Sequence, residues 1–220
     1  KGVFAGISGH KSNQMLARLD RDVINKRPDW MTLSCGVNDV WHGKRGVELE
    51  PYRKNIAAII DKAQAAGIKV MVLTSTMIRE DQSNGLNQKL LGYNAALKEL
   101  AASKGCLLAD LNTRMQDKLK TFPEDAPKGK QLTRDGVHMN AYGNIMMASG
   151  VLAAFGLSQE ELAACEAAWK SAPNTMSIRL QVGMSIADYE AIQNKTGQSP
   201  ETVFARFLEE KKAELLPGKK

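Results

Sequence analysis

Short apolar runs alternate along the chain with longer stretches in which apolar residues recur every three or four positions. Short, continuous apolar runs are typical of buried β-strands, whereas the longer periodic stretches predict amphipathic helices. The predicted strands are residues 3–5, 30–35, 70–73 and 106–109. The predicted helices are residues 15–24, 52–66, 88–103 and 140–155.

This alternation predicts βαβ units and a parallel sheet covered by helices on both faces, because strands that are apolar on both faces must be buried on both. Ligands of such sheets bind beyond the carboxyl ends of the strands. We therefore expect chemistry in the loops that follow Ala5, Cys35, Leu73 and Asp110.

The pattern changes after Gly156. A helix predicted at Ser158 is followed by an alternating strand, residues 178–182, and by two short helices that begin near Ser185 and Ser199. We predict two parts. Residues 1–156 form an α/β domain, and residues 157–220 form a small C-terminal extension.

The strand and two helices of the extension faintly resemble a ribbon-helix-helix module, in which paired strands read DNA. The strand offers Arg179 as its one basic residue, with Gln181 beside it, so docking or homodimerisation is favoured over DNA binding.

Composition narrows the function classes. The chain has 220 residues, of which 43% are hydrophobic and 25% charged, as in a globular protein. Its net charge of +6 is scattered without a basic stripe of interleaved aromatics, which argues against a nucleic-acid partner. The longest uncharged stretch, residues 139–159, is broken by Asn, Ser and Gly, so no membrane span is expected. Three His and three scattered Cys suggest no metal site, and no cofactor is expected.

Asp135 and His138 stand three residues apart, just before a predicted helix. At this spacing the carboxylate can accept a hydrogen bond from one imidazole nitrogen, which leaves the other nitrogen free to act as a general base. The alternative is a surface loop with incidental charges.

Two further loops offer hydrogen-bond donors. Gly36 lets the chain turn after the strand 30–35, and Asn38 then points a side-chain amide to the site as an oxyanion donor. Gly9, after the first predicted strand, offers a backbone N–H in the same role. Taken alone, each is equally well explained as an ordinary turn.

Together, the three segments resemble the SGNH hydrolases, also called the GDSL esterase/lipase family, in order and spacing over about residues 2–156. The resemblance implies a flavodoxin-like three-layer α/β/α sandwich and a Ser-His-Asp triad. It assigns Asp135 and His138 as the triad acid and base, and Gly9 and Asn38 as the oxyanion hole.

The family's nucleophile, the Ser of a GDS motif after the first strand, is absent from this sequence. Residues 3–5 then correspond to the family's second strand. We expect that the chain is truncated before Lys1, lacks its first strand and is inactive alone. Within the chain, the candidates for a replacement nucleophile are Ser8, Ser12, Ser34 and Cys35, and none of them is favoured.

The resemblance implies a serine-type ester hydrolase without cofactor, and we expect a small acyl ester as substrate, such as an acetylated carbohydrate. His10, Trp41 and His42 are candidates to line its pocket, although exposed loop positions are the simpler interpretation. The alternative function is a non-catalytic ligand- or carbohydrate-binding relative that lacks the nucleophile. An export signal would precede Lys1, so the compartment stays open, with a secreted or periplasmic location favoured.

Overall fold

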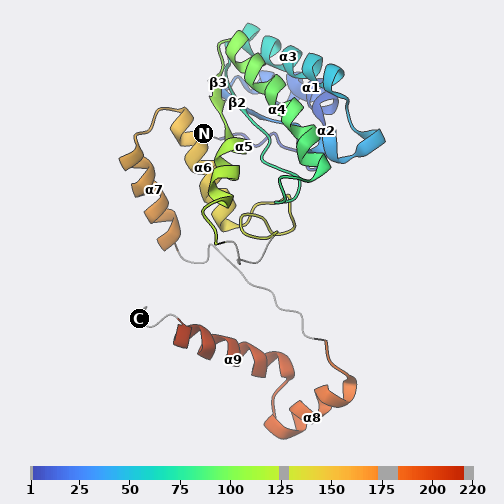
Figure 1. Cartoon of the computed structure of the whole chain (residues 1–220), viewed down its shortest axis with the longest axis vertical. Coiled ribbons are helices and arrows are strands. Elements are labelled where there is room, and N and C mark those ends of the chain that lie inside the picture. Colours follow the sequence, from blue (N-terminus) through green and yellow to red (C-terminus); the bar gives the residue numbers. More distant parts are fainter. Residues whose placement is uncertain (1, 124–128, 173–182, 216–220) are drawn as a thin grey trace. The chain divides into compact units, whose positions relative to one another are not determined.

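The computed structural model describes residues 2–123, 129–172 and 183–215, and it divides the chain into two compact units, residues 1–176 and 177–220 (Figure 1). The first unit contains a parallel sheet in the order β1-β2-β3. Its strands are β1 (Trp30–Ser34), β2 (Lys69–Leu73) and β3 (Leu107–Ala109). The predicted α/β class is confirmed.

Helices cover both faces of this sheet (Figure 1). The first face carries α1 (Ser12–Asp22), α3 (Leu49–Ala65) and α4 (Gly85–Ser103), and the second carries α5 (Leu111–Leu119) and α6 (Ala141–Ala154). Val70 and Val72 pack toward the first face, whereas Met71 and Leu73 pack toward the second, as the two-residue period of a strand requires. The three-layer sandwich is therefore confirmed.

Short elements connect these layers. They are η1 (Ile24–Lys26) after α1, and α2 (Val37–Trp41) and η2 (Gly43–Arg45) after β1. Within the described residues, no helix is long and apolar enough to cross a lipid bilayer.

The outer side of β1 is open. β2 pairs with one edge of β1, and no described strand pairs with the other. The predicted strand at residues 3–5 is wrong, because this segment has no regular structure and is mostly exposed. The physical reason is that a cavity of about 470 Å³ separates residues 2–6 from β1. The segment is therefore too far from this strand to pair with it.

The helix predicted after Ser158 is α7 (Gln159–Ser171), which packs against α6. Leu162 is buried, and the Ser149 hydroxyl donates a hydrogen bond of 2.7 Å to Glu166. The first compact unit thus includes α7, whereas the sequence-based division at residue 156 stays a prediction.

The second unit contains α8 (Ile186–Thr196) and α9 (Pro200–Leu215), which contact each other. As predicted, α8 begins next to Ser185, which caps it in a reciprocal arrangement with Asp188. The predicted strand 178–182 lies outside the described residues.

Candidate active site

Asp135 and His138 form a hydrogen-bonded pair in the loop before α6. Asp135 Oδ2 lies 2.7 Å from His138 Nδ1, and Asp135 Oδ1 accepts the backbone N–H groups of Val137 and His138 at 3.0 and 2.8 Å. Both side chains are more than half exposed. The Asp135 carboxylate accepts only, so the Nδ1 atom carries the ring proton and Nε2 is free to accept one.

These contacts also determine the charge of the Asp135 carboxyl group. The backbone N–H of His138, followed by its ring and by the backbone N–H of Val137, holds the pKa of Asp135 well below its usual range. Asp135 is therefore ionised at neutral pH, which is the state that stabilises a protonated imidazole.

The backbone around this pair allows no side chain at Gly136 or Gly143. Gly136 has a φ of +94°, which favours glycine, and a Cβ there would meet Arg79 Cα at 3.2 Å. A Cβ at Gly143, in the first turn of α6, would meet the backbone oxygen of Leu132. These two glycines let the Asp135–His138 loop lie against the rest of the fold.

Asn38 follows a constrained turn at the carboxyl end of β1. Gly36 has a φ of +138°, and a Cβ there would meet Ser75 Oγ at 2.5 Å. The Tyr52 and Ser75 hydroxyls both donate to the carbonyl of Cys35, which fixes the start of the turn. Asn38 then donates from Nδ2 to the backbone oxygen of His10 at 3.1 Å.

The predicted oxyanion loop lies beside Asn38. Gly9 has a φ of +76°, is exposed, and its N–H makes no hydrogen bond to the described residues. Behind it, the buried Asp39 accepts both the N–H and the hydroxyl of Ser12 through Oδ1, at 3.0 and 2.6 Å. These hydrogen bonds join α2, which carries Asn38, to the first residue of α1, which directly follows the loop that contains Gly9.

The structure brings the predicted residues together as two pairs. Asp135 bonds to His138, and Asn38 bonds to the segment that contains Gly9, but within the described ranges no hydrogen bond joins one pair to the other. Whether Gly9 and Asn38 form an oxyanion hole therefore stays a prediction.

The three predicted pocket residues are in different environments. His10 is half-buried and accepts a hydrogen bond from Arg18 Nε at 3.2 Å, which restrains its ring. Trp41 and His42 are exposed at the end of α2. Their role toward a substrate stays a prediction.

Among the described residues, no hydrogen bond joins His138 to Ser8, Ser12, Ser34 or Cys35. Ser12 is buried and bonded to Asp39. Cys35 is also buried, and this burial, followed by the nearby Asp39 charge, raises the pKa of its thiol far above the usual range. A neutral thiol is a poor nucleophile, so Cys35 is a packing residue.

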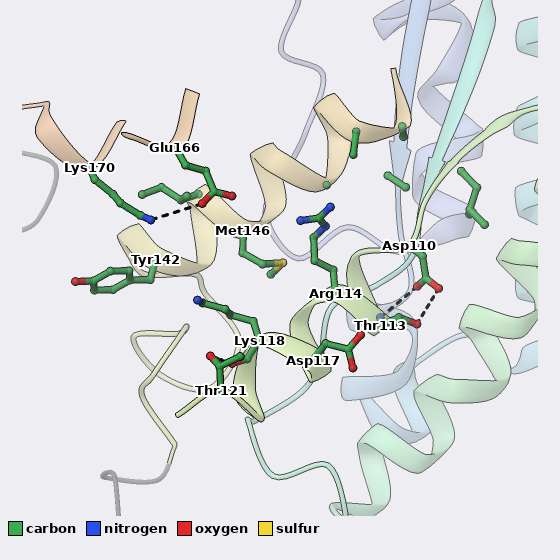
Figure 2. Close-up of a pocket in the computed structure, with 16 residues that line it drawn as sticks. Asp110, Thr113, Arg114, Asp117, Lys118, Thr121, Tyr142, Met146, Glu166 and Lys170 are labelled. Carbon is green, nitrogen blue, oxygen red and sulfur yellow. Dashed lines mark hydrogen bonds and ion pairs between the residues drawn. The ribbon is translucent and has the colours of Figure 1, made fainter. Parts of the chain in front are cut away.

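A cavity of about 760 Å³ lies between α5, α6 and α7 (Figure 2), and none of the predicted site residues lines it. Arg114 and Lys118 enter it from α5, and Tyr142 and Met146 from α6. Its acidic residues already have partners: Asp110 pairs with Lys98, Asp117 with Lys120, and Glu166 with Lys170. In none of these ion pairs do an acid and a base point toward a shared position in the cavity, as a catalytic pair would. Among the described residues no group of His, Cys, Asp and Glu could hold a metal ion.

Sequence reasoning missed two buried carboxylates that hold these loops, Glu80 and Asp39. Glu80 lies in the loop after β2 and accepts hydrogen bonds from residues 131–133. Asp39 lies next to Asn38, in a motif that the sequence did single out. Glu80 belongs to no motif, and its partners lie some fifty residues away in the chain.

Comparisons with known proteins identify relatives of this chain. Residues 1–144 match the GDSL-like lipase/acylhydrolase family. An acetylxylan esterase from Geobacillus stearothermophilus is 25% identical over 161 residues, which cover 70% of this chain and 71% of that protein.

Solved structures show the same similarity. The structure of AlAXEase, an acetyl xylan esterase, matches with a TM-score of 0.63 at 35% identity, and the match covers 68% of this chain and 78% of that one. LAE5, an α/β hydrolase from the metagenome of Lake Arreo in Spain, matches with a TM-score of 0.61 at 26% identity over 68% and 69% of the two chains. The chain belongs to the GDSL-like lipase/acylhydrolase family.

Proposed function

We propose that the protein hydrolyses esters by the serine route, with His138 as the general base. The observation that carries this proposal is the 2.7 Å contact between His138 Nδ1 and Asp135 Oδ2. It fixes the imidazole tautomer and leaves Nε2 as a proton acceptor, which is the arrangement that activates a hydroxyl nucleophile.

The reaction follows from these roles. His138 Nε2 takes the proton of a serine hydroxyl as the serine oxygen attacks the acyl carbonyl, and it later returns a proton to the leaving alcohol. Asp135 stabilises the imidazolium. The Gly9 N–H and the second N–H of the Asn38 amide, beyond the one given to His10, stabilise the oxyanion. Water then cleaves the acyl-enzyme with the same base.

We further propose that the nucleophilic serine precedes Lys1. Two observations support this proposal: the edge of β1 with which no described strand pairs, and the cavity of about 470 Å³ between that edge and residues 2–6. The cavity is lined by β1 and by the apolar Leu19, Val23 and Ile59, which suit an apolar strand, and its lining also includes Arg18, Asp22 and Lys26. A strand placed there ends at the same edge of the sheet as β1.

For the substrate, we propose an acetyl ester on a carbohydrate. The support is the similarity to two acetylxylan esterases. The exposed setting of the Asp135–His138 pair also suits a substrate that stays largely in solvent, such as a sugar chain.

The test is fluorophosphonate labelling of the protein expressed from its intact reading frame, with the labelled peptide sequenced by mass spectrometry. We expect a label on a serine upstream of Lys1, and loss of the label in a His138→Ala variant. A label on Ser8, Ser12 or Ser34 would contradict the upstream assignment. A folded protein that takes no label and hydrolyses no acetyl ester would favour the non-catalytic binding relative.

Homodimerisation through the C-terminal extension stays a prediction. Its support is the apolar side of α9, where Phe204, Phe207 and Leu208 remain partly exposed. Light scattering on the full protein and on a version ending at residue 176 tests it: equal oligomeric states would exclude a role of the extension.

A further inference from the structure

The Glu80 carboxylate occupies an unusual position for an acidic side chain. It is 8% exposed, and it accepts hydrogen bonds from three successive backbone N–H groups, those of Gln131, Leu132 and Thr133, at 2.8, 2.8 and 2.7 Å. The Thr133 hydroxyl donates a fourth bond, of 2.8 Å. Both carboxylate oxygens are used, and no described cation pairs with the group.

These hydrogen bonds end at the residues that lead into the Asp135–His138 loop. The Thr133 hydroxyl that donates to Glu80 also accepts the N–H of Gly136 at 3.0 Å. Arg79, the neighbour of Glu80, donates its backbone N–H to the Gly136 oxygen at 2.7 Å. Two adjacent residues of the loop after β2 therefore hold the Asp135–His138 loop on both sides of Asp135.

The hydrogen bonding requires an acidic side chain. A carboxylate offers about four acceptor positions on two oxygens, whereas an amide has a single acceptor oxygen and an NH2 group that would face the Gln131 N–H. Burying a carboxylate is costly unless several donors compensate it, and here four donors do. Apolar packing of Leu132 among Met77 and Met146 secures the segment but does not orient its N–H groups.

We propose that Glu80 is a positioning residue for the Asp135–His138 pair: by binding the N–H groups of residues 131–133, it fixes the loop that sets the direction of the His138 ring. This inference rests on the proposed function, in which His138 is the base. The Glu80 carboxylate makes no hydrogen bond to the imidazole, and its four hydrogen bonds all come from residues 131–133, so it acts through that segment of the loop.

The test compares Glu80→Gln with Glu161→Gln in the protein expressed from its intact reading frame. Glu161 is the matched control, because its carboxylate also accepts a backbone N–H, that of Ser158 at 2.8 Å, at the start of α7. We measure kcat and KM with p-nitrophenyl acetate, the thermal midpoint, and the downfield proton NMR signal of the His138 Nδ1–H bonded to Asp135. A His138→Ala variant assigns that signal.

We expect Glu80→Gln to lower kcat about tenfold or more while KM stays within about twofold, because a loosened base affects the chemical step more than binding. The His138 proton signal broadens or disappears at a temperature where the variant is still folded. Glu161→Gln leaves kcat and the signal unchanged. If a folded Glu80→Gln protein keeps kcat within twofold and keeps the signal, the inference is overturned. If His138→Ala itself retains activity, the proposed function fails instead.

Thr133 gives a second test should Glu80→Gln not fold. Thr133→Ser keeps the hydroxyl that links Glu80 to Gly136, and Thr133→Val removes it at nearly equal volume. We expect Thr133→Ser to keep kcat and the NMR signal, and Thr133→Val to lower kcat and broaden the signal. Equal kcat and equal signals in the two folded variants would overturn the inference.

Discussion

The loop that carries Asp135 and His138 and the loop that carries Gly9 are each held by a buried carboxylate, but the two attachments differ. Glu80 binds three successive backbone N–H groups and a hydroxyl. Toward the Gly9 loop, Asp39 binds only Ser12, whose N–H and hydroxyl both donate to Oδ1. The other oxygen, Oδ2, accepts the Cys35 thiol at 3.3 Å. Glu80 thus holds the loop of Asp135 and His138 along several residues, whereas Asp39 holds the end of the Gly9 loop at one residue, Ser12. Asn38 and Arg18 add hydrogen bonds to His10, and Gly9 itself is exposed.

This difference matches the tasks proposed for the two loops. A general base must hold one ring direction, because proton transfer depends steeply on geometry. A backbone oxyanion donor has one N–H to aim, and substrate binding can complete its position. Four expected effects, in decreasing size, test the comparison.

The largest effect is expected from His138→Ala in the base loop. Because serine and histidine act as one unit, we expect kcat to fall by about 10³-fold or more. Steady-state hydrolysis of p-nitrophenyl acetate by the intact protein measures it. A variant within tenfold of the wild type would exclude His138 as the base.

A smaller effect is expected from Asn38→Ala beside the Gly9 loop. Removal of one oxyanion donor typically costs about 10²–10³ in kcat, and we expect a loss in that range. The same assay applies, with Asn55→Ala as control, because Asn55 donates to Ser12 from α3 and faces no predicted reacting atom. Wild-type activity in Asn38→Ala would contradict its role.

The third substitution is Asp39→Asn, for comparison with Glu80→Gln. An Asn at this position keeps the oxygen that accepts both Ser12 hydrogen bonds, so we expect kcat/KM to fall by less than about threefold. Asp39→Ala, which removes both bonds, should cost about tenfold or more, since it leaves two buried donors unpaired. If Asp39→Asn were as damaging as Glu80→Gln, the two attachments would not differ as described.

The smallest effect concerns acid stability. The fold lowers the pKa of Asp135 below its ordinary value of 3.8, so the contribution of this group to stability is complete above that pH and is lost as the pH falls further below it. Because the group is more than half exposed, the effect is small, less than about 1 kcal/mol. Thermal midpoints of the wild type and of Asp135→Asn at pH 6 and pH 2 measure it: the difference between the two proteins should shrink at pH 2.

Much of this fold, and the contact between Asp135 and His138 in the candidate site, could be predicted from local sequence signals. The apolar run at residues 70–73 identified β2, and the Ser158 and Ser185 caps located α7 and α8. The Asp135–His138 pair was predictable because its spacing alone lets the two side chains meet.

Other features depend on contacts that no local pattern encodes. α5 was not predicted, because its sequence is mostly polar and its apolar stripe consists of Leu111, Met115 and Leu119 alone. The segment 3–5 looked like a strand, but a strand needs a partner, and no strand of the described residues pairs with it. The role of Glu80 could not be predicted either, because the residues that donate hydrogen bonds to it are distant in the sequence.

The Glu80 hydrogen bonds also bear on how the protein opens. The amide protons of residues 131–133 are bonded to a side chain rather than to a helix or sheet, so they exchange with solvent whenever Glu80 separates from the loop, without unfolding of β2 or α6. Hydrogen–deuterium exchange at these amides therefore reports a local free energy of opening, distinct from that of global unfolding. Catalytic competence can then be lost by a molecule whose core is still native, and heat inactivation would precede melting.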